Sequence, residues 1–403
     1  MRGTVSGRSR EVTGSAAPGT PVCNNHPLVA KGVIRVSDDL DRLVDRVRQL
    51  DGENGQRLHR AVERYRRAPA VQVTGRAGVG KTTLARALAR PDIVETAPLD
   101  TPGVPDPVLD GDVVVYVVAE SLQPPDVAAL QALRGTALVA LNKADVLAVG
   151  GGGWGAVLAR ADEYAKDLAV QVVPVVAAIA ATAARATMTP AETRSLRTLG
   201  DLNDPTLLLG ADLFLGADVI IDARARRTML DRWELYGLDC AMTALRHEPD
   251  LSPESVTGLL HAVSGIDGFR AALDRTLSQA LAGRGAALLD ELDRLAARSA
   301  AARNDIEAYL RSDEALFMGL TSGLAAPELA GIADRRSVLR PASAEQARDL
   351  ADWWREVAQG PAAGPGARRA ALRVQHAYTR AWARLARGRS RDLGLAPGPG
   401  HRG

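Results

Sequence analysis

Short runs of apolar residues alternate with amphipathic segments between position 71 and about position 190. Such runs are typical of parallel strands that are buried on both faces. The chain has four of them, at 71–74, 112–118, 137–141 and 170–175. Helical spacing at 126–133 and 154–168 separates them. This alternation predicts an α/β fold with a doubly wound parallel sheet, and Pro174 indicates that the last strand is at an end or an edge.

After residue 190 the strand pattern fades and apolar residues recur at the spacing of amphipathic helices. Helices are predicted at 230–245, 253–263, 269–281, 286–297, 302–310, 345–357 and 367–385. Two more precede the sheet region, and Ser37 is the predicted N-cap of the first. The sheet domain is therefore expected to follow short N-terminal helices and to precede an α-helical C-terminal region.

These patterns divide the chain into five predicted segments. The Gly-, Ser-, Pro- and Arg-rich N-terminus and the Gly- and Pro-rich C-terminus are expected to be disordered. The segments are a disordered stretch at 1–36, helices at 37–68, the α/β domain at 69–190, an α-helical domain at 191–387 and a disordered tail at 388–403.

The composition fits a globular protein with an aliphatic core. Apolar residues make up 46% of the 403 positions but aromatic residues only 3%, so the core is expected to consist mostly of Ala, Leu and Val. A formal net charge of +2 gives little reason to expect a polyanionic partner. The two cysteines, the lack of an apolar leader and the lack of a membrane-length apolar run predict a soluble, cytoplasmic protein.

A glycine-rich loop follows the first apolar run and precedes a helical stretch. Strand, glycine loop and helix in this order form the context of a phosphate-binding P-loop, whose backbone amides point at phosphate oxygens. Lys81 is expected to reach the β- and γ-phosphates, and the Thr82 hydroxyl to ligate Mg²⁺. The predicted nucleotide-contacting residues are Gly75, Arg76, Ala77, Gly78, Val79, Gly80, Lys81, Thr82 and Thr83.

The distribution of lysines adds a second argument. Arginine supplies nearly all of the basic residues, and the only lysines are Lys31, Lys81, Lys143 and Lys166. A planar guanidinium does not replace a compact ammonium that packs against a phosphate or a base. Two of the four lysines lie in candidate nucleotide motifs, which a general drift of composition toward arginine does not explain.

A second candidate motif is Asp100-Thr101-Pro102-Gly103. It follows 95–99, a predicted strand, so Asp100 can hold Mg²⁺ through a water and the Gly103 amide can meet the γ-phosphate. An ordinary turn, favoured by Asp, Pro and Gly, is the alternative.

The third motif is Asn142-Lys143-Ala144-Asp145, directly after an apolar strand. The Asp145 carboxylate can accept hydrogen bonds from N1–H and the exocyclic amine of guanine, a donor pair that adenine lacks. The Lys143 stem can lie over the base, and Asn142 can bind its edge or tie loops together. A solvated turn is again the alternative.

Together the three motifs resemble translation-factor-class GTPases, in particular the bacterial Era-like and dynamin-like branch. The resemblance covers residues 71–180, and 230–237 looks more loosely like the helical part of bacterial dynamin-like proteins. It implies a P-loop GTPase domain that binds GTP or GDP with Mg²⁺. It also implies that the backbone amide of Ala177 meets the guanine oxygen, although Val176 stands where that family usually has serine.

The chain departs from the family pattern in one respect. The family has a switch loop with an Mg²⁺-binding threonine and then a strand between the first helix and the Asp-x-x-Gly strand, and here only 91–94 remain. Thr96 is a poor substitute. The residues left for catalysis are Lys81, Thr82 and Gly103, so slow intrinsic hydrolysis is expected.

The leading hypothesis is a GTPase that acts as a nucleotide-dependent switch on its helical region. That region is expected to bind a partner protein or another copy of the chain, with a membrane surface or RNA as weaker candidates. The alternatives are a non-catalytic nucleotide-binding scaffold and an ATP-using P-loop enzyme. The six histidines have no metal-ligand spacing, and Trp353, Trp354 and Trp382 are read as core residues rather than anchors.

Overall fold

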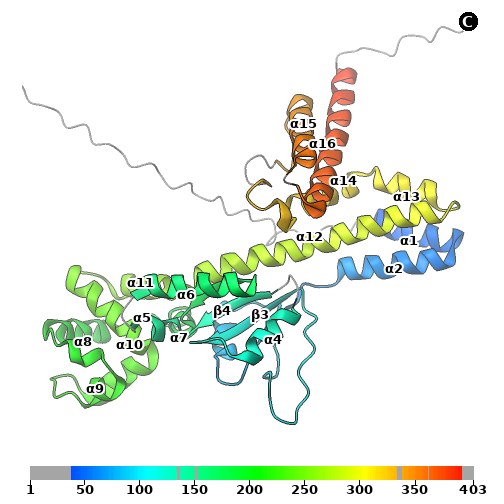
Figure 1. The fold of residues 1–403 in the computed structure, drawn as a ribbon. Coiled ribbons are helices and arrows are strands. Elements are labelled where there is room, and N and C mark those ends of the chain that lie inside the picture. The colour runs from blue at the N-terminus through cyan, green and yellow to red at the C-terminus, as the bar shows by residue number, and fades with distance from the viewer. Residues whose placement is uncertain (1–37, 134–136, 150–152, 334–337, 362, 393–403) are drawn as a thin grey trace, which may run out of the picture. The chain divides into compact units, whose positions relative to one another are not determined.

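Parallel strands form the centre of the fold in the computed structural model, which describes residues 38–133, 137–149, 153–333, 338–361 and 363–392 (Figure 1). Within these residues the sheet has five strands, in the order β2-β1-β3-β4-β5. The strands are β1 (Val71–Thr74), β2 (Ile93–Glu95), β3 (Val113–Ala119), β4 (Ala137–Asn142) and β5 (Gln171–Val175).

All neighbouring strands of the sheet are parallel. The chain passes from β1 to β2 on one side and then returns to β3 on the other side of β1. The strand order therefore reverses at β1, and in sheets of this kind ligands bind beyond the carboxyl ends of the strands at such a point.

The other elements of the described residues are helices. In the first half of the chain the helices are α1 (Asp38–Leu50), α2 (Gly52–Arg66), α3 (Lys81–Leu88), α4 (Pro124–Ala132), α5 (Ala144–Val149), α6 (Gly153–Leu168) and α7 (Ala177–Ala183). In the second half they are α8 (Pro190–Asp201), η1 (Pro205–Leu208), α9 (Ala211–Gly216), α10 (Ala223–His247), α11 (Pro253–Val263), α12 (Ile266–Arg298), α13 (Arg303–Leu310), α14 (Asp313–Leu324), η2 (Pro327–Leu329), α15 (Ala344–Gln359) and α16 (Pro365–Asp392).

Helices cover both faces of the sheet. On one face, apolar side chains of α3, α7 and the first half of α12 pack against β1, β3, β4 and β5. On the other face, Leu130 of α4 and Ala161 of α6 pack against β3, β4 and β5. The predicted α/β class with a parallel sheet and a helical C-terminal region is thereby confirmed.

The second strand is placed differently from the prediction. A strand was expected at 95–99, but β2 spans 93–95 and pairs Glu95 with Val73 of β1. Pro98 lacks an amide hydrogen for a ladder, so 96–99 continue as irregular backbone. Pro174 lies in β5, which is an edge strand as its proline indicated.

The two helices predicted at 269–281 and 286–297 are one continuous helix, α12. The glycines inside α12 do not end the helix. At Gly285, close packing against α14 favours a residue without a side chain. A Cβ at Gly285 would lie 3.0 Å from both the Met318 and the Ser322 side chain of α14. The missing side chain lets the two helices approach.

The remaining helices build three further cores. Leu288, Leu289, Leu292 and Leu295 of α12 pack with α1, α2, α13 and α14. α15 and α16 share a core in which Trp354 is fully buried, whereas Trp382 is 40% exposed, so the core interpretation is confirmed for Trp354 and wrong for Trp382. The third core contains α5, α7, α8, α10 and α11.

Several predictions for the termini concern residues at or beyond the ends of the described ranges. Ser37 and the segment 1–36 lie outside the described residues, and the described ones fall within a single compact unit. α16 continues to Asp392, past the predicted start of the tail at 388, while 393–403 also lie outside the description. Within the described residues, no helix combines the length and the apolar character that a membrane span requires.

Candidate functional site

The loop from Gly75 to Thr82 joins β1 to α3 and wraps tightly at the carboxyl end of the strand. Gly75, Gly78 and Gly80 have φ angles of 140°, 76° and 93°, a region that favours glycine. A Cβ at Gly75 would lie 2.5 Å from the Val117 carbonyl oxygen, and one at Gly80 would lie 2.3 Å from Asn142 Nδ2. Glycine is therefore required at both positions by conformation and by space.

Lys81 is the first residue of α3, and its side chain is buried under the loop. Its ammonium donates to the carbonyl oxygens of Gly75 and Arg76, at 3.0 and 2.9 Å. Burial lowers the pKa of Lys81, and the carboxylate of Glu95 opposes that shift. A compact cation is thus held at the centre of a backbone cradle, where an anion can replace the two carbonyl contacts.

A buried carboxylate anchors the loop from the opposite face of the sheet. Asp126 Oδ1 accepts from Arg76 Nε at 3.0 Å and from the Tyr116 hydroxyl at 2.9 Å, and Oδ2 accepts from the Gln123 amide at 2.8 Å. Burial and the neighbouring carboxylate raise the pKa of Tyr116. The sequence analysis missed Asp126, whose only local signal is a capping box with Gln123.

The acidic side chain that contacts Thr82 is Glu95, which was not among the predicted site residues. Thr82 Oγ1 donates to Glu95 Oε1 at 2.8 Å. Asp100, the predicted metal-side residue, is exposed with φ 58°, and its amide donates to Asp106 Oδ1 at 3.0 Å. Glu95 ends β2 beside the cradle, whereas Asp100 lies in the loop that follows.

The predicted catalytic Gly103 also belongs to that exposed loop. It lies in a turn closed by a hydrogen bond from the Val104 amide to the Thr101 carbonyl. The part of the segment that contacts the P-loop comes earlier, where the Leu99 amide donates to the Gly75 carbonyl at 3.2 Å. The contacts at the cradle thus come from 95–99, and the turn at Gly103 stands apart from them.

Asn142 links the P-loop to the loop that follows β5. Its Nδ2 donates to the Val79 carbonyl at 2.9 Å, and its Oδ1 accepts from the Ala177 amide at 3.0 Å. Both bonds are buried. Asn142 thus ties the two loops together, as one of its two predicted roles requires, and the Ala177 amide, which is predicted to meet the guanine oxygen, donates to Asn142 in this structure.

Asp145 lies half-buried in the first turn of α5, after an exposed Lys143 with φ 54°. Burial raises the pKa of Asp145, although nearby amides and Lys143 oppose the shift, and the carboxylate of Glu120 adds to it. Burial raises the pKa of Glu234 in α10 as well, and the charge of Asp145 adds to that shift. The carboxylate is thus poorly solvated and lies among other acids, which favours a ligand that donates hydrogen bonds to it.

Two of the three motifs and the loop that contains Ala177 lie at one edge of the sheet. The P-loop follows β1, the Asn142–Asp145 segment follows β4 and the Ala177 loop follows β5, all at carboxyl ends. The edge offers a cradle for an anion with a buried cation, and a carboxylate that can accept two donors. Among the described residues there is no cluster of three or more metal-ligating side chains.

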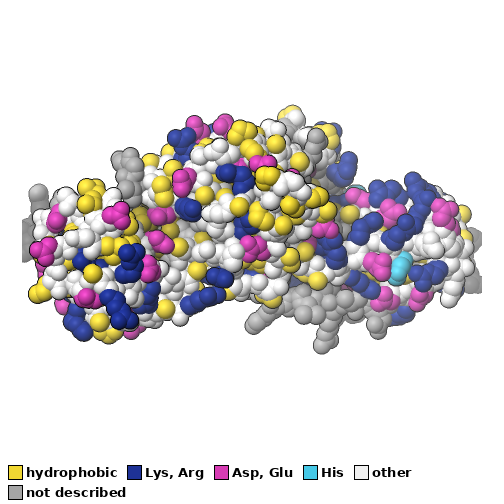
Figure 2. Space-filling model, turned by 90° about the horizontal axis from the view of Figure 1, so that it is seen from below, with side chains coloured by type: hydrophobic (Ala, Val, Ile, Leu, Met, Phe, Trp, Pro, Cys, Tyr) yellow, Lys and Arg dark blue, Asp and Glu magenta, His cyan; other side chains and the backbone are white. Residues whose placement is uncertain are grey.

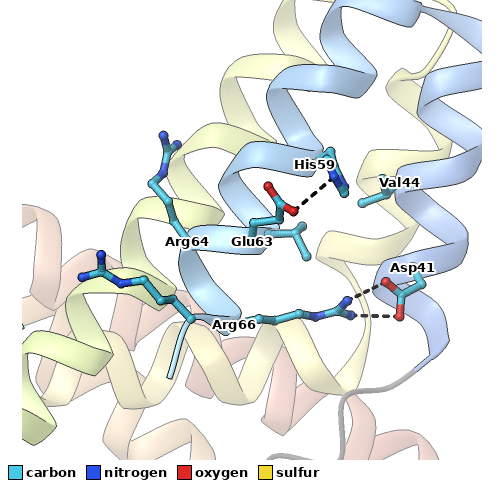
Figure 3. Close-up of a pocket in the computed structure, with 8 residues that line it drawn as sticks. Asp41, Val44, His59, Glu63, Arg64 and Arg66 are labelled. Atoms are coloured by element: carbon cyan, nitrogen blue, oxygen red, sulfur yellow. Dashed lines mark hydrogen bonds and ion pairs between the residues drawn. The ribbon is translucent and has the colours of Figure 1, made fainter. Parts of the chain in front are cut away.

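Two surface hollows lie elsewhere and carry less chemistry. One, of about 500 Å³ between α1 and α2, is lined by side chains that pair with each other (Figure 3). Arg66 donates to Asp41 at 2.5 and 3.1 Å, and His59 lies 3.4 Å from Glu63. The other is formed by α3 and α7, and Arg86, Arg185 and Thr83, the last of the predicted nucleotide-contacting residues of the loop, are among its lining.

Charged side chains do not separate by sign on the face drawn in Figure 2. Lysine and arginine are spread over it with aspartate and glutamate between them. This distribution agrees with the small net charge of +2 and gives no support to a broad polyanion-binding surface on that face.

Comparisons of the chain with protein-family models, with curated proteins and with solved structures find no match.

Proposed function

We propose that the protein is a guanine-nucleotide-binding GTPase that hydrolyses GTP slowly to GDP and phosphate. The observation that carries this proposal is the Asn142 side chain, which bonds to both the P-loop and the Ala177 loop. A phosphate cradle and a base-recognising carboxylate are useful to one ligand only if their loops hold a fixed relation, and Asn142 provides that link.

The phosphate end of the site relies on backbone amides, the start of α3 and Lys81. A nucleotide's β- and γ-phosphates would take the Lys81 ammonium from the two carbonyl oxygens that hold it. The Thr82 hydroxyl and the Glu95 carboxylate offer oxygen donors, which suit Mg²⁺. When bound, Mg²⁺ would neutralise part of the charge on the phosphate oxygens. The protein offers these two oxygen ligands, few for Mg²⁺, which fits an Mg²⁺ ion that binds together with the nucleotide.

The slow rate follows from how little chain lies between α3 and β2. α3 ends at Leu88 and β2 begins at Ile93, and the connecting Arg90 is paired with Asp92 at 2.9 Å and also with Asp274 of α12. So short and tethered a connection supplies no switch loop between α3 and β2 to orient the attacking water. We expect unaided turnover below about 1 s⁻¹, because positioning supplies most of the catalysis in phosphoryl transfer.

The output of the proposed switch is the helical region that packs on the base-binding loops. Ala144, Ala148 and Val176 share a core with Trp233 and Leu238 of α10. A change in the position of α5 or α7 would therefore alter the packing against α10. We propose that a partner protein, or a second copy of the chain, binds in a way that depends on that change.

Nucleotide binding by titration calorimetry tests the proposal. GTP, GDP, ATP and XTP are compared on the unaltered protein, Lys81→Ala and Asp145→Asn. We expect Lys81→Ala to weaken every guanine nucleotide. We expect Asp145→Asn to weaken GTP by about 100-fold and to favour XTP, because the amide donates where the carboxylate accepted.

Matched controls use exposed residues of α6. Lys166→Ala and Asp162→Asn remove the same charges at the protein surface and should leave all affinities unchanged. ATP held as firmly as GTP, or no nucleotide bound at all, would contradict the proposal.

A non-catalytic scaffold is the second candidate, and the short α3–β2 connection favours it. The two candidates differ in whether GTP and GDP bind with different affinity, since equal affinities leave no free energy to drive a switch. An ATP-using enzyme remains the third and would require ATP to compete with GTP.

A further inference from the structure

Glu95 stands at the mouth of the phosphate cradle. Its Oε1 accepts the Thr82 hydroxyl at 2.8 Å, and its charge acts on the buried Lys81 ammonium. Both of these partners belong to the P-loop, and both side chains are assigned to phosphate or metal under the proposed function. The Glu95 carboxylate therefore faces the space where the negative phosphates and their cation would lie.

The sheet holds the main chain at Glu95 beside the P-loop strand, and the Thr82 hydroxyl is the hydrogen-bond partner of its carboxylate. Glu95 pairs with Val73 in the sheet register, and the next residue, Thr96, donates from its amide to the Val73 carbonyl at 3.0 Å. The Thr96 hydroxyl also donates to Thr74 Oγ1 at 2.8 Å. These bonds hold the main chain at Glu95 and Thr96 against β1, the strand that carries the P-loop.

A fixed carboxylate beside a phosphate cradle has two opposite effects. Without a cation it repels the triphosphate, whose own charge is strongly negative. With a divalent cation between them it becomes an attractive oxygen donor, directly or through water. Glu95 and Asp100 are both exposed, but Asp100, in the following loop, shares neither the Thr82 contact nor the pairing with β1.

We propose, as a deepening of the proposed function and resting on it, that Glu95 makes nucleotide binding conditional on a divalent cation. It does so by opposing metal-free triphosphate and by completing the metal side of the site with Thr82. Asp100, the residue that the Asp-x-x-Gly pattern indicates, does not have this role.

The experiment measures GTP affinity by titration calorimetry at low ionic strength, with excess EDTA and with excess MgCl₂. The proteins are the unaltered chain, Glu95→Gln and Asp100→Asn. Glutamine keeps an oxygen that accepts the Thr82 hydroxyl and removes only the charge. We expect Glu95→Gln to bind GTP about tenfold more tightly in EDTA and to gain about tenfold less from Mg²⁺.

The signs of the two changes separate this role from a structural one. A variant that merely disturbs the loop binds more weakly in both conditions, and that result would overturn the proposal, as would an unchanged ratio of the two affinities. Asp100→Asn should keep the wild-type ratio, and a changed ratio there with none in Glu95→Gln would move the role to Asp100. If the unaltered protein binds ATP and GTP alike, only the guanine proposal fails, whereas no binding at all overturns both.

Discussion

The side chain of Asp126 shows how one buried residue can organise a loop made mainly of glycine. It is fully buried, and its two oxygens receive the Arg76 guanidinium, the Tyr116 hydroxyl and the Gln123 amide. Arg76 is the second residue of the P-loop, so this network joins the cradle to α4 and to the centre of the sheet. The loop owes part of its rigidity to this network.

Replacing Asp126 with alanine tests that network. The change leaves the buried Tyr116 hydroxyl without its acceptor and frees Arg76. We expect a loss of about 3 kcal/mol in the free energy of unfolding, because removing one partner of a buried charged network is costly. Urea denaturation followed by circular dichroism measures it.

An exposed ion pair provides the control for that measurement. Glu307 lies on α13 and pairs with Arg311 at 2.8 Å, and their side chains are 44% and 66% exposed. We expect Glu307→Ala to cost less than about 1 kcal/mol, as exposed pairs usually do. Equal losses in the two variants would show that Asp126 adds nothing beyond an ordinary surface pair.

At the scale of the element, α10 is interrupted at a residue close to the candidate base site. Glu234 has φ 53° and ψ 165°, a conformation that is found almost only in glycine. The helix on either side is firmly held. Glu192 accepts from Arg232 at 2.5 Å, and Gly237 lies so near Ile179 of α7 that a Cβ there would be 3.1 Å from its Cδ1. The break lets both halves of α10 keep these contacts.

A glycine at position 234 should therefore relieve strain. We expect Glu234→Gly to raise the free energy of unfolding by about 1 kcal/mol, because the backbone conformation costs a residue with a side chain more than glycine loses in entropy. Thermal unfolding of the full chain measures the change.

Alanine at the same position separates backbone strain from the effect of the charge. Glu234→Ala removes the half-buried carboxylate, whose pKa burial and Asp145 both raise, but keeps a Cβ. We expect it to be less stable than Glu234→Gly by about 1 kcal/mol. If alanine stabilises as much as glycine, the carboxylate and not the backbone is the source of the strain.

At the scale of the whole molecule, α12 connects two cores that are far apart in the sequence. Phe269, Leu273 and Leu277 cover the sheet face that carries the P-loop strand, while leucines from 288 to 295 pack with α1 and α2. Arg270 also donates to the Ala87 carbonyl at 2.7 Å, at the end of α3. One face of the sheet that begins at residue 71 is thus covered by residues about 200 positions later in the chain.

This dependence predicts a large effect from one distant residue. Leu273 is fully buried, and Leu273→Ala should lower the free energy of unfolding by about 2–5 kcal/mol through lost burial and an unfilled cavity. Denaturant unfolding with circular dichroism measures it. Leu372 on α16 is 39% exposed, and Leu372→Ala should change stability by less than about 1 kcal/mol. A small effect at Leu273 would mean that the sheet holds together without α12.

Much of this protein follows from local sequence. Continuous apolar runs predict the parallel strands, because strands covered on both faces need apolar side chains on both. Glycines at 75, 78 and 80 predict the tight loop, since they permit the positive φ angles found there. Asn142 and Asp145 could also be placed, because a polar pair that directly follows an apolar strand lies at the carboxyl edge of the sheet.

Other features are decided only by the tertiary structure. The choice between Glu95 and Asp100 at Thr82 depends on where β2 ends, and the pairing with β1 sets that end rather than a pattern in the residues themselves. Asp126 and Leu273 are unremarkable in sequence and gain their roles from partners 50 and about 190 positions away. Local preference determines which residues form strands, loops and helices, but packing between distant segments determines which side chains meet.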